Sequence, residues 1–198
     1  MKVNEIFYSI QGEGAHVGRP ALFVRFSGCN LNCPFCDTEF QRYTEMSEDD
    51  IMRKLELLNF DGCDFVVLTG GEPLLQLNKT LCDLLHENGY YIAVESNGTI
   101  EKDLPIDWLT ISPKHIFTPA RTKVKKCNEV KLLVDDKTNF FQLQHIQNTI
   151  EAEHYFLQPI DTANAINKAV NISKTIQLVK EHPLWRISLQ TQKILNVQ

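Results

Sequence analysis

The sequence has 198 residues, of which 43% are hydrophobic and 23% charged, and its formal net charge is −5. This balance is typical of a globular protein with a substantial core. An acidic chain lacks the broad basic face needed for sequence-independent nucleic-acid binding. No apolar run approaches the ~20 residues that span a bilayer, and the first residues lack the apolar stretch of a secretory signal. We therefore expect one cytoplasmic domain spanning residues 1–198, with neither nucleic acid nor membrane as partner.

Apolar patterning predicts strands and helices in alternation. In chain order it predicts a strand over 21–27, a helix over 47–58 with Ser47 as N-cap, a strand over 64–69, a helix over 73–88 ending before Gly89, strands over 90–96, 107–112 and 129–135, a helix over 140–150, a strand over 154–160, a helix near 162–181 and a strand over 184–190. Strands that are apolar throughout and separated by helices indicate a parallel sheet, either open or rolled into a barrel.

Polar or glycine-rich segments follow most of the predicted strands. They are the cysteine-rich segment 29–36, GGEP at 70–73, ESNGT at 95–99, SPK at 112–114, QPID at 158–161 and QTQK at 190–193. The loops at the opposite edge carry no comparable clusters. Because ligands bind at the carboxyl edge of parallel strands, these segments predict one shared site.

Three cysteines, Cys29, Cys33 and Cys36, form the pattern C-x3-C-x2-C. In a reducing compartment such a cluster indicates metal binding or redox chemistry rather than a disulfide. A structural zinc site needs a fourth ligand, for which His16 or a distant thiol is the candidate. A C-x-x-C redox motif leaves Cys29 unexplained, and ferredoxin runs supply a fourth cysteine. The spacing favours a four-iron cluster with one open iron, with zinc and simple packing as alternatives.

The other three cysteines, Cys63, Cys82 and Cys127, are isolated in the sequence. Free cysteine is among the most buried residue types. We expect all three to be small buried hydrophobic side chains.

The cysteine pattern and GGEP resemble the cluster loop and the cofactor-binding segment of the radical S-adenosylmethionine (SAM) superfamily. Longer blocks are similar, in order, to the 7-carboxy-7-deazaguanine synthase family: residues 7–38, 69–73, 95–99, 112–114, 157–161 and 186–198. The resemblance implies an α/β fold, a shortened and incomplete parallel (β/α) barrel of the radical SAM type, working as a homodimer. The chain is too short for a full eight-unit barrel of ~250 residues.

The resemblance also implies a reaction. It would be a lyase that contracts the ring of 6-carboxy-5,6,7,8-tetrahydropterin to 7-carboxy-7-deazaguanine and releases ammonia, in the biosynthesis of queuosine and other 7-deazapurines. The implied cofactors are a [4Fe–4S] cluster, SAM and Mg²⁺. An electron donor such as flavodoxin would reduce the cluster, and SAM would be cleaved to a 5′-deoxyadenosyl radical and regenerated.

Site residues follow from the same resemblance. Cys29, Cys33 and Cys36 would hold the cluster and Thr38 would bind Mg²⁺, although a turn hydroxyl bonded to backbone is the alternative for Thr38. Residues expected to bind SAM are Phe35, Cys36, Asp37, Gly71, Glu72, Gly98, Ser112, Pro113, Lys114, Gln158, Pro159, Ile160 and Asp161. Residues expected to bind the pterin are Ile10, Gln11, Gly12, Glu13, Arg25, Ser96 and Gln198.

Arg25 lies in a predicted buried strand. Such an arginine either pairs with a protein carboxylate or, as the resemblance implies, grips the substrate carboxylate in two bonds. The chain departs from the family at Ser96, where Thr is common, at Gln192, where His is common, and at Gln198, where Pro occurs. The role of Gln192 is left open. We expect the tail 192–198 to run extended over the substrate, with Gln198 contacting it through the backbone.

Two other functions compete. A glycyl-radical enzyme activase has the same cysteine loop but acts on a protein; QGEG, Arg25 and Thr38 favour a small anionic substrate. A non-catalytic zinc or iron–sulfur binding module would leave GGEP and SPK without a purpose.

Overall fold

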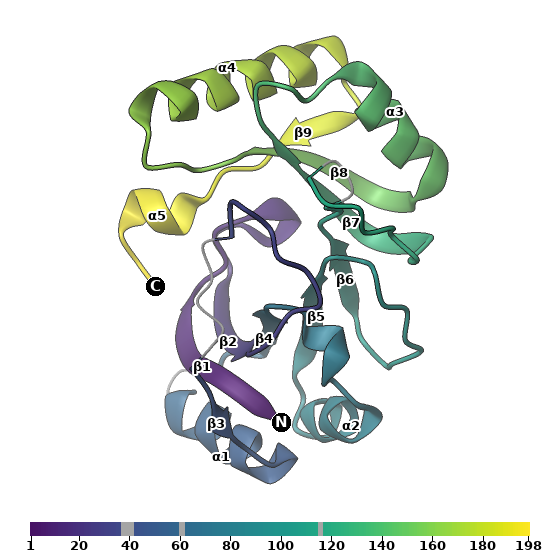
Figure 1. Cartoon of the computed structure of the whole chain (residues 1–198). Coiled ribbons are helices and arrows are strands. Elements are labelled where there is room, and N and C mark those ends of the chain that lie inside the picture. The colour runs from purple at the N-terminus through teal and green to yellow at the C-terminus, as the bar shows by residue number, and fades with distance from the viewer. Residues whose placement is uncertain (37–41, 60–61, 115–116) are drawn as a thin grey trace.

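The computed structural model describes residues 1–36, 42–59, 62–114 and 117–198 (Figure 1). Along the chain the elements are β1 (Lys2–Ile10), η1 (Gly14–His16), β2 (Pro20–Phe26), β3 (Thr44–Glu45), α1 (Glu48–Leu58), β4 (Phe65–Gly70), η2 (Pro73–Leu75), α2 (Lys79–Glu87), β5 (Tyr91–Ser96), β6 (Trp108–Ile111), β7 (Lys126–Val134), α3 (Phe140–Thr149), β8 (Glu151–Pro159), α4 (Ala165–Glu181), β9 (Trp185–Ile187) and α5 (Thr191–Leu195). No helix among these is both long and apolar enough to cross a bilayer.

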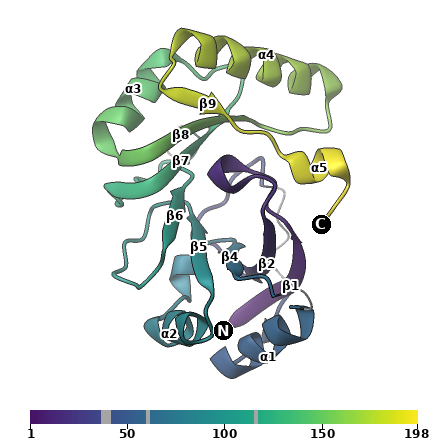
Figure 2. The ribbon, with the colours of Figure 1, turned by 180° about the vertical axis from the view of Figure 1, so that it is seen from behind.

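All the described strands belong to one sheet in the order β3-β1-β2-β4-β5-β6-β7-β8-β9. Every neighbouring pair from β2 to β9 is parallel, and the sheet curves without closing, so that β3 and β9 form its two edges (Figures 1 and 2). This confirms the expected α/β class and the incomplete barrel. Helices α1 to α4 flank the outside of the curved sheet, and the segment carrying η1 lies within the curve.

The sequence analysis missed the antiparallel edge of the sheet. Strand β1 pairs antiparallel with β2 and with the two-residue β3. In β1, KVNEIFYSI, buried Val3 and Phe7 are separated by exposed or half-buried residues. A strand that buries only one face lacks the continuous apolar run that predicts a strand buried on both faces.

Two large hydrophobic clusters hold the sheet to its helices. Leu22 and Leu68 of the first half pack with Ile51 of α1 and Leu85 of α2, all of them fully buried. In the second half, buried residues of β7 and β8 pack against α3 and α4, as Leu143 illustrates. Both halves of the sheet are thereby packed against helices. The carboxyl ends of the strands carry the loops that build a site.

One predicted helix is confirmed in full and another only in part. Helix α1 is confirmed, with Ser47 and Asp50 forming a reciprocal capping box. The predicted helix over 73–88 is wrong in its first turns, where a 3₁₀ turn precedes α2. Asn78 caps α2 by accepting a hydrogen bond from the Leu81 backbone, which favours a new helix start there. Its end before Gly89, which has φ +80°, is confirmed.

The C-terminal segment also differs from the prediction. Residues 191–195 form α5 rather than an extended chain, and Asn196 ends this helix with φ 54°. Asparagine is one of the few residues that adopts this left-handed conformation readily. Among the isolated cysteines, Cys82 and Cys127 are buried as expected, but Cys63 is only half-buried.

Replacing Asn78 with Ala is expected to lower the free energy of unfolding by about 1 kcal/mol or somewhat more. The change removes the cap of α2 and also the 2.8 Å hydrogen bond from Asn78 Nδ2 to Glu48 of α1. Urea unfolding measures the difference. Asn167→Ala on the exposed face of α4 is the matched control and is expected to change little. Equal stability of the two variants would contradict the assignment of Asn78 as the cap.

Candidate active site

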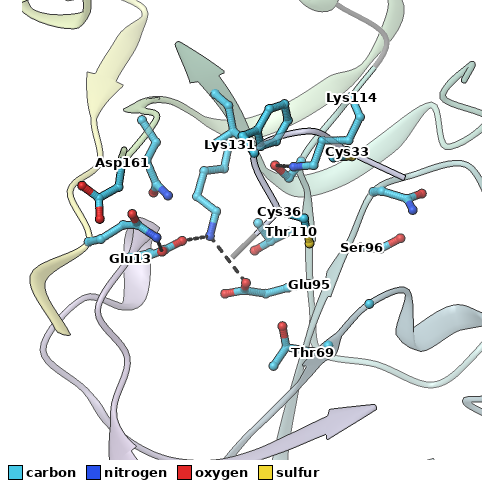
Figure 3. A pocket seen from close by; sticks show the side chains of 18 of the residues that line it. Glu13, Cys33, Cys36, Thr69, Glu95, Ser96, Thr110, Lys114, Lys131 and Asp161 are labelled. Atoms are coloured by element: carbon cyan, nitrogen blue, oxygen red, sulfur yellow. Dashed lines mark hydrogen bonds and ion pairs between the residues drawn. The ribbon is translucent and has the colours of Figure 1, made fainter. Parts of the chain in front are cut away.

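One pocket of about 570 Å³ opens at the carboxyl edge of the parallel strands (Figure 3). This volume lies in the range of small-molecule sites. Its walls come from the cysteine segment, from the ends of β4, β5, β6, β7 and β8, and from the segment that contains α5. The polar segments that the sequence places after successive strands therefore meet around a single cavity.

The three cysteines of the C-x3-C-x2-C motif all line this pocket. Cys29 Sγ accepts hydrogen bonds from the Leu31 backbone (3.4 Å) and from Asn97 Nδ2 (4.0 Å). Burial is the main reason that the pKa values of Cys29 and Cys33 are raised. No three His, Cys, Asp or Glu side chains within the described ranges gather around a single metal position. In an iron–sulfur cubane each thiolate binds a different iron, so the thiols need not converge on one point.

The glycine loop after β4 packs directly against the cysteine loop. The Gly71 backbone donates to Phe26 O (3.1 Å), and the Glu72 backbone donates to Gly28 O (3.0 Å). A Cβ added at Gly71 would lie 2.1 Å from Gly28 O and 2.9 Å from Cys29 Cβ. Only glycine permits this approach, and the close contact fits a group held jointly by the two loops.

Glu72 of GGEP points away from the pocket. It is fully buried, and its carboxylate accepts from the Leu74 backbone (3.0 Å), from Ser96 Oγ (2.9 Å) and from the Asn97 backbone (2.8 Å). Burial raises its pKa despite these bonds. The expectation that Glu72 binds SAM is thus limited to its backbone, because the side chain ties the glycine loop to the ESNGT loop. That arrangement also places Ser96 on the pocket wall.

The other residues expected to bind SAM fall into three groups. Those on the pocket wall are Phe35, Cys36, Gly71, Ser112, Lys114, Gln158, Pro159, Ile160 and Asp161. Gly98 and Pro113 lie in the adjoining loops but not on the wall, and Asp37 lies outside the described residues, as does the expected magnesium ligand Thr38. Lys114 Nζ donates to Ser112 Oγ (2.5 Å), and desolvation lowers the pKa of Lys114 to about 8.

Part of the pocket wall, here called the floor, consists of a buried lysine between carboxylates (Figure 3). Lys131 of β7 pairs with Glu13, in the loop after β1, and its Nζ lies 3.5 Å from Glu95 Oε2 of β5. Burial by itself raises the pKa of Glu13, but the Lys131 cation and hydrogen bonds from Gln190 and Gln192 outweigh it and lower the value to about 2. The same carboxylates raise the pKa of Lys131 against its own burial.

Of the residues expected to bind the pterin, Gln11 and Gly12 support the floor from behind. Gln11 is buried and donates from Nε2 to Glu95 Oε1 (2.9 Å). Gly12 O accepts from the Thr191 backbone (3.0 Å), which joins the loop after β1 to the start of α5. Ile10 ends β1 and does not line the pocket. Gln192 occupies the pocket wall and donates to Glu13 Oε1 (3.1 Å).

Arg25 lines the pocket and is paired at the same time with a protein carboxylate. Its Nε donates to Glu5 Oε1 (2.7 Å), and the other oxygen of Glu5 accepts from Gln198 Nε2 (2.8 Å). Ser9 Oγ donates to the Gln198 main-chain oxygen (2.6 Å). Val197, rather than Gln198, stands on the wall. The described residues give the terminal nitrogens of Arg25 no other acceptor, so these remain available to a ligand.

Several residues of the pocket wall were not identified from the sequence. They include Glu5, Thr69, Glu95, Asn97, Thr110, Lys131, Gln190 and Lys193. For two of these residues, Lys131 and Glu95, the sequence contains some indication of a special position. Lys131 interrupts the apolar run VKLLV and lies two residues after Glu129, so both charges share one face of a buried strand. Glu95 was seen as part of ESNGT, but nothing in that motif separates it from its neighbours.

Comparison with known proteins agrees with this geometry. The model of the radical SAM superfamily matches residues 23–129. The chain is 42% identical over 197 residues to the 7-carboxy-7-deazaguanine synthase of Bacteroides thetaiotaomicron, covering 100% of this chain and 98% of the relative. It is 37% identical over 215 residues to the Burkholderia multivorans protein of the same name, with 98% of each chain covered.

Solved structures give the same result for the fold. The crystal structure of QueE from Escherichia coli superposes with a TM-score of 0.80 at 27% identity, covering 96% of this chain and 93% of that one. A structure of TYW1 with a lysine–pyruvate adduct bound shares the fold alone, with a TM-score of 0.55 at 14% identity. Sequence identities of 42% and 37% over nearly the whole chain, together with a superfamily match over more than half of the sequence, show that the chain belongs to the 7-carboxy-7-deazaguanine synthase family of the radical SAM superfamily.

Proposed function

We propose that the chain converts 6-carboxy-5,6,7,8-tetrahydropterin to 7-carboxy-7-deazaguanine in the biosynthesis of queuosine or other 7-deazapurines. Substrate and product differ by one molecule of ammonia, so the ring contraction is redox-neutral overall. The observation that carries the proposal is one pocket joining a three-cysteine loop to Arg25 and to the Glu13–Lys131–Glu95 floor. Membership of the synthase family supports the same reaction.

The radical SAM family implies a [4Fe–4S] cluster and SAM as cofactors. When bound, they supply a 5′-deoxyadenosyl radical that takes a hydrogen atom from the substrate. In this proposal Cys29, Cys33 and Cys36 anchor the cluster. The glycine loop, the SPK segment and residues 158–161 hold SAM beside it. The chain's own contribution is to orient the substrate and to close the cavity to water.

The charges of the pocket suit a substrate with one anionic group and one edge rich in N–H donors. Arg25 offers two terminal nitrogens to a carboxylate, and the carboxylates of the floor can accept from the amino-pyrimidine edge of a pterin. Among the described wall residues, Arg25, Lys131 and Lys193 are already paired with acidic side chains. An added divalent cation would offset the substrate carboxylate, which supports Mg²⁺ as a further cofactor, with Thr38 as its proposed ligand.

The remaining partners belong to the proposal as well. Continuity of the sheet supports a single radical SAM domain over residues 1–198. Reduction of the cluster requires an electron donor, for which a flavodoxin-type protein in a reducing cytoplasm is proposed.

A homodimer is supported by exposed apolar side chains on neighbouring parts of α4 and α5. These are Ile166, Ile194 and Leu195, which a second copy of the chain would cover. Asp161 joins these two helices through ion pairs to Lys168 and Lys193.

The competing functions lack comparable support. An activase acting on a protein would need a surface for that protein rather than an acidic floor for a small molecule. A binding module without catalysis would leave Arg25 and the paired carboxylates unexplained. Anaerobic incubation with the tetrahydropterin, SAM, Mg²⁺ and a reductant tests the proposal directly. Formation of 7-carboxy-7-deazaguanine is expected, and its absence with a fully loaded cluster would overturn the assignment.

Substituting Ala for any one of Cys29, Cys33 and Cys36 is expected to abolish cluster binding, because these thiolates are its protein anchors. Iron and acid-labile sulfide analysis of the reconstituted protein measures the loss. Cys63→Ser is the matched control, since Cys63 lies outside the pocket. Loss of iron in the control, or a retained cluster in the alanine variants, would contradict the assignment.

Arg25→Lys is expected to raise KM for the substrate by roughly tenfold, since lysine keeps the charge but loses the planar fork. A substrate analogue without the carboxylate should bind equally well to both proteins. Arg19→Lys serves as the control because Arg19 pairs with Asp64 (2.9 Å) and does not line the pocket. Unchanged KM in Arg25→Lys would remove Arg25 from the carboxylate site.

Deleting Val197 and Gln198 is expected to weaken substrate binding while leaving iron content and SAM binding unchanged. Val197 forms part of the wall, and Gln198 ties the tail to Glu5 and Ser9. The sequence analysis attributed the role of Gln198 to backbone alone, but the bond from its side chain to Glu5 changes that expectation. Gln198→Glu, which would oppose Glu5 with a like charge, should also raise KM, more than Gln198→Ala. Wild-type KM in the deletion variant would exclude a closing tail.

A further inference from the structure

Lys131 occupies an unusual position for a lysine. It lies on the interior strand β7 with 5% of its side chain exposed, and its cation meets carboxylates from two other segments. Glu13 lies in the loop after β1, and Glu95 lies at the end of β5. A third carboxylate, Glu129, is buried on β7 and accepts from the Ala15 backbone (2.8 Å). Desolvating one lysine and three glutamates costs free energy, so the arrangement calls for a functional explanation.

The hydrogen bonds around the floor make its geometry rigid. Glu13 Oε1 accepts from Gln190 Nε2 (2.9 Å) and Gln192 Nε2 (3.1 Å), while Glu13 Oε2 pairs with Lys131. Glu95 has spare acceptor capacity, because only Gln11 Nε2 (2.9 Å) and the longer contact to Lys131 (3.5 Å) reach it among the described residues. It is also the more exposed of the two, with 26% of its side chain accessible against 13% for Glu13. Glu13 is thus held by two side-chain amides and Glu95 by one, and the Lys131 cation contacts both carboxylates.

Electrostatics explains why a cation is needed at this point. Two neighbouring carboxylates in a desolvated site do not both stay ionised, because burial and like charge each raise their pKa values. Protonation would turn a hydrogen-bond acceptor into a donor. Such a change would present the wrong group to a ligand edge made of N–H donors.

We propose that Lys131 is a positioning residue that holds the carboxylates of Glu13 and Glu95 on the pocket wall, keeps Glu13 ionised, and so sets the specificity for a substrate with an N–H donor edge. The inference rests on the proposed function for the identity of that substrate. The role assigned to Lys131 is indirect, although its side chain also lines the pocket. It acts through the two carboxylates, of which Glu95 has the freer acceptor atoms.

The pH dependence of binding follows from the groups that face Glu13. These are Lys131 and Glu129 from β7, Glu95 from β5, Gln190 and Gln192 from the segment after β9, and Lys114 from the loop after β6. With Lys131 present the pKa of Glu13 is about 2, so its ionised form persists at all pH values at which the protein is assayed. Without the cation, burial raises the pKa of Glu13. The protonated fraction then grows as the pH falls.

The test is Lys131→Met in the holoenzyme, with KM measured between pH 6 and pH 8. Loss of charged acceptors is expected to raise KM by roughly ten- to a hundredfold. The increase should be largest at the acidic end, while wild-type KM shows no such trend. Iron content and SAM binding should not change. Lys131→Arg keeps the cation and should keep KM independent of pH. Lys126→Met, on the same strand but outside the pocket, is the control for losing a lysine paired with a glutamate.

A second comparison addresses specificity. A substrate analogue with oxygen in place of the 2-amino group removes N–H donors from the recognised edge. Wild type is expected to discriminate against it, and Lys131→Met should lose most of that discrimination. Equal discrimination in both proteins, or a KM that rises equally at every pH, would show that Lys131 has only a structural role and would overturn the proposal.

Two further measurements keep the test decisive. If Lys131→Met does not fold, Lys131→Gln keeps a hydrogen-bond donor without the charge, and it should give the same rise in KM at acidic pH. Carbon-13 NMR of glutamate carboxyls, comparing wild type with Lys131→Met and assigning Glu13 with Glu13→Gln, needs no turnover. It therefore remains valid if the wild type fails to convert the tetrahydropterin. An unchanged Glu13 pKa in the methionine variant would refute the proposal by itself.

Discussion

The site depends on the register between β2 and β4, because this register brings the cysteine loop and the glycine loop into backbone contact. Phe26 pairs with Gly70 at the end of the two parallel strands, so the loops that follow begin at the same level. The hydrogen bonds from Gly71 to Phe26 and from Glu72 to Gly28 continue this pairing beyond the sheet. A side chain at position 71 would separate the loops, since its Cβ would overlap Gly28 O. The cluster loop is therefore positioned by main-chain geometry rather than by the cysteines themselves.

The remainder of the pocket is organised by charge pairs that span distant parts of the chain. Lys131 connects β7 to β5 and to the loop after β1, and Glu5 connects Arg25 of β2 to the C-terminal residue. Asp161 joins the loop after β8 to α4 and α5. Each of these charge pairs links elements that lie far apart in the sequence or that belong to different parts of the fold. Since desolvation strengthens such pairs when geometry is good, closing the pocket over a ligand would reinforce them.

Glu72 shows how a motif residue acquires a different role in the folded protein. GGEP resembles a SAM-binding segment, and the backbone of Gly71 does reach the pocket wall. The Glu72 carboxylate instead ties that loop to Ser96 and Asn97, two residues of the next motif. The two loops accordingly form one unit in which the cofactor side and the substrate side of the pocket are connected. Motifs that are separate in the sequence thus share a buried acceptor.

The sequence alone determined the parallel core, the three-cysteine motif on the pocket wall and the common edge of the site, because apolar runs and cysteine spacing are local patterns. It also predicted Arg25 as a site residue, but left open whether a protein carboxylate or a ligand is its partner. The structure shows that Glu5 accepts a hydrogen bond from Arg25 Nε, and within the described part of the chain the two terminal nitrogens have no further acceptor. Antiparallel β1, the start of α2 at Asn78, and α5 in place of an extended tail were decided by tertiary contacts that no local pattern records. Lys131 and Glu95 were missed for the same physical reason. Their meaning comes from a pairing across 36 residues of sequence, and only the packed sheet brings the two charges within 3.5 Å of each other.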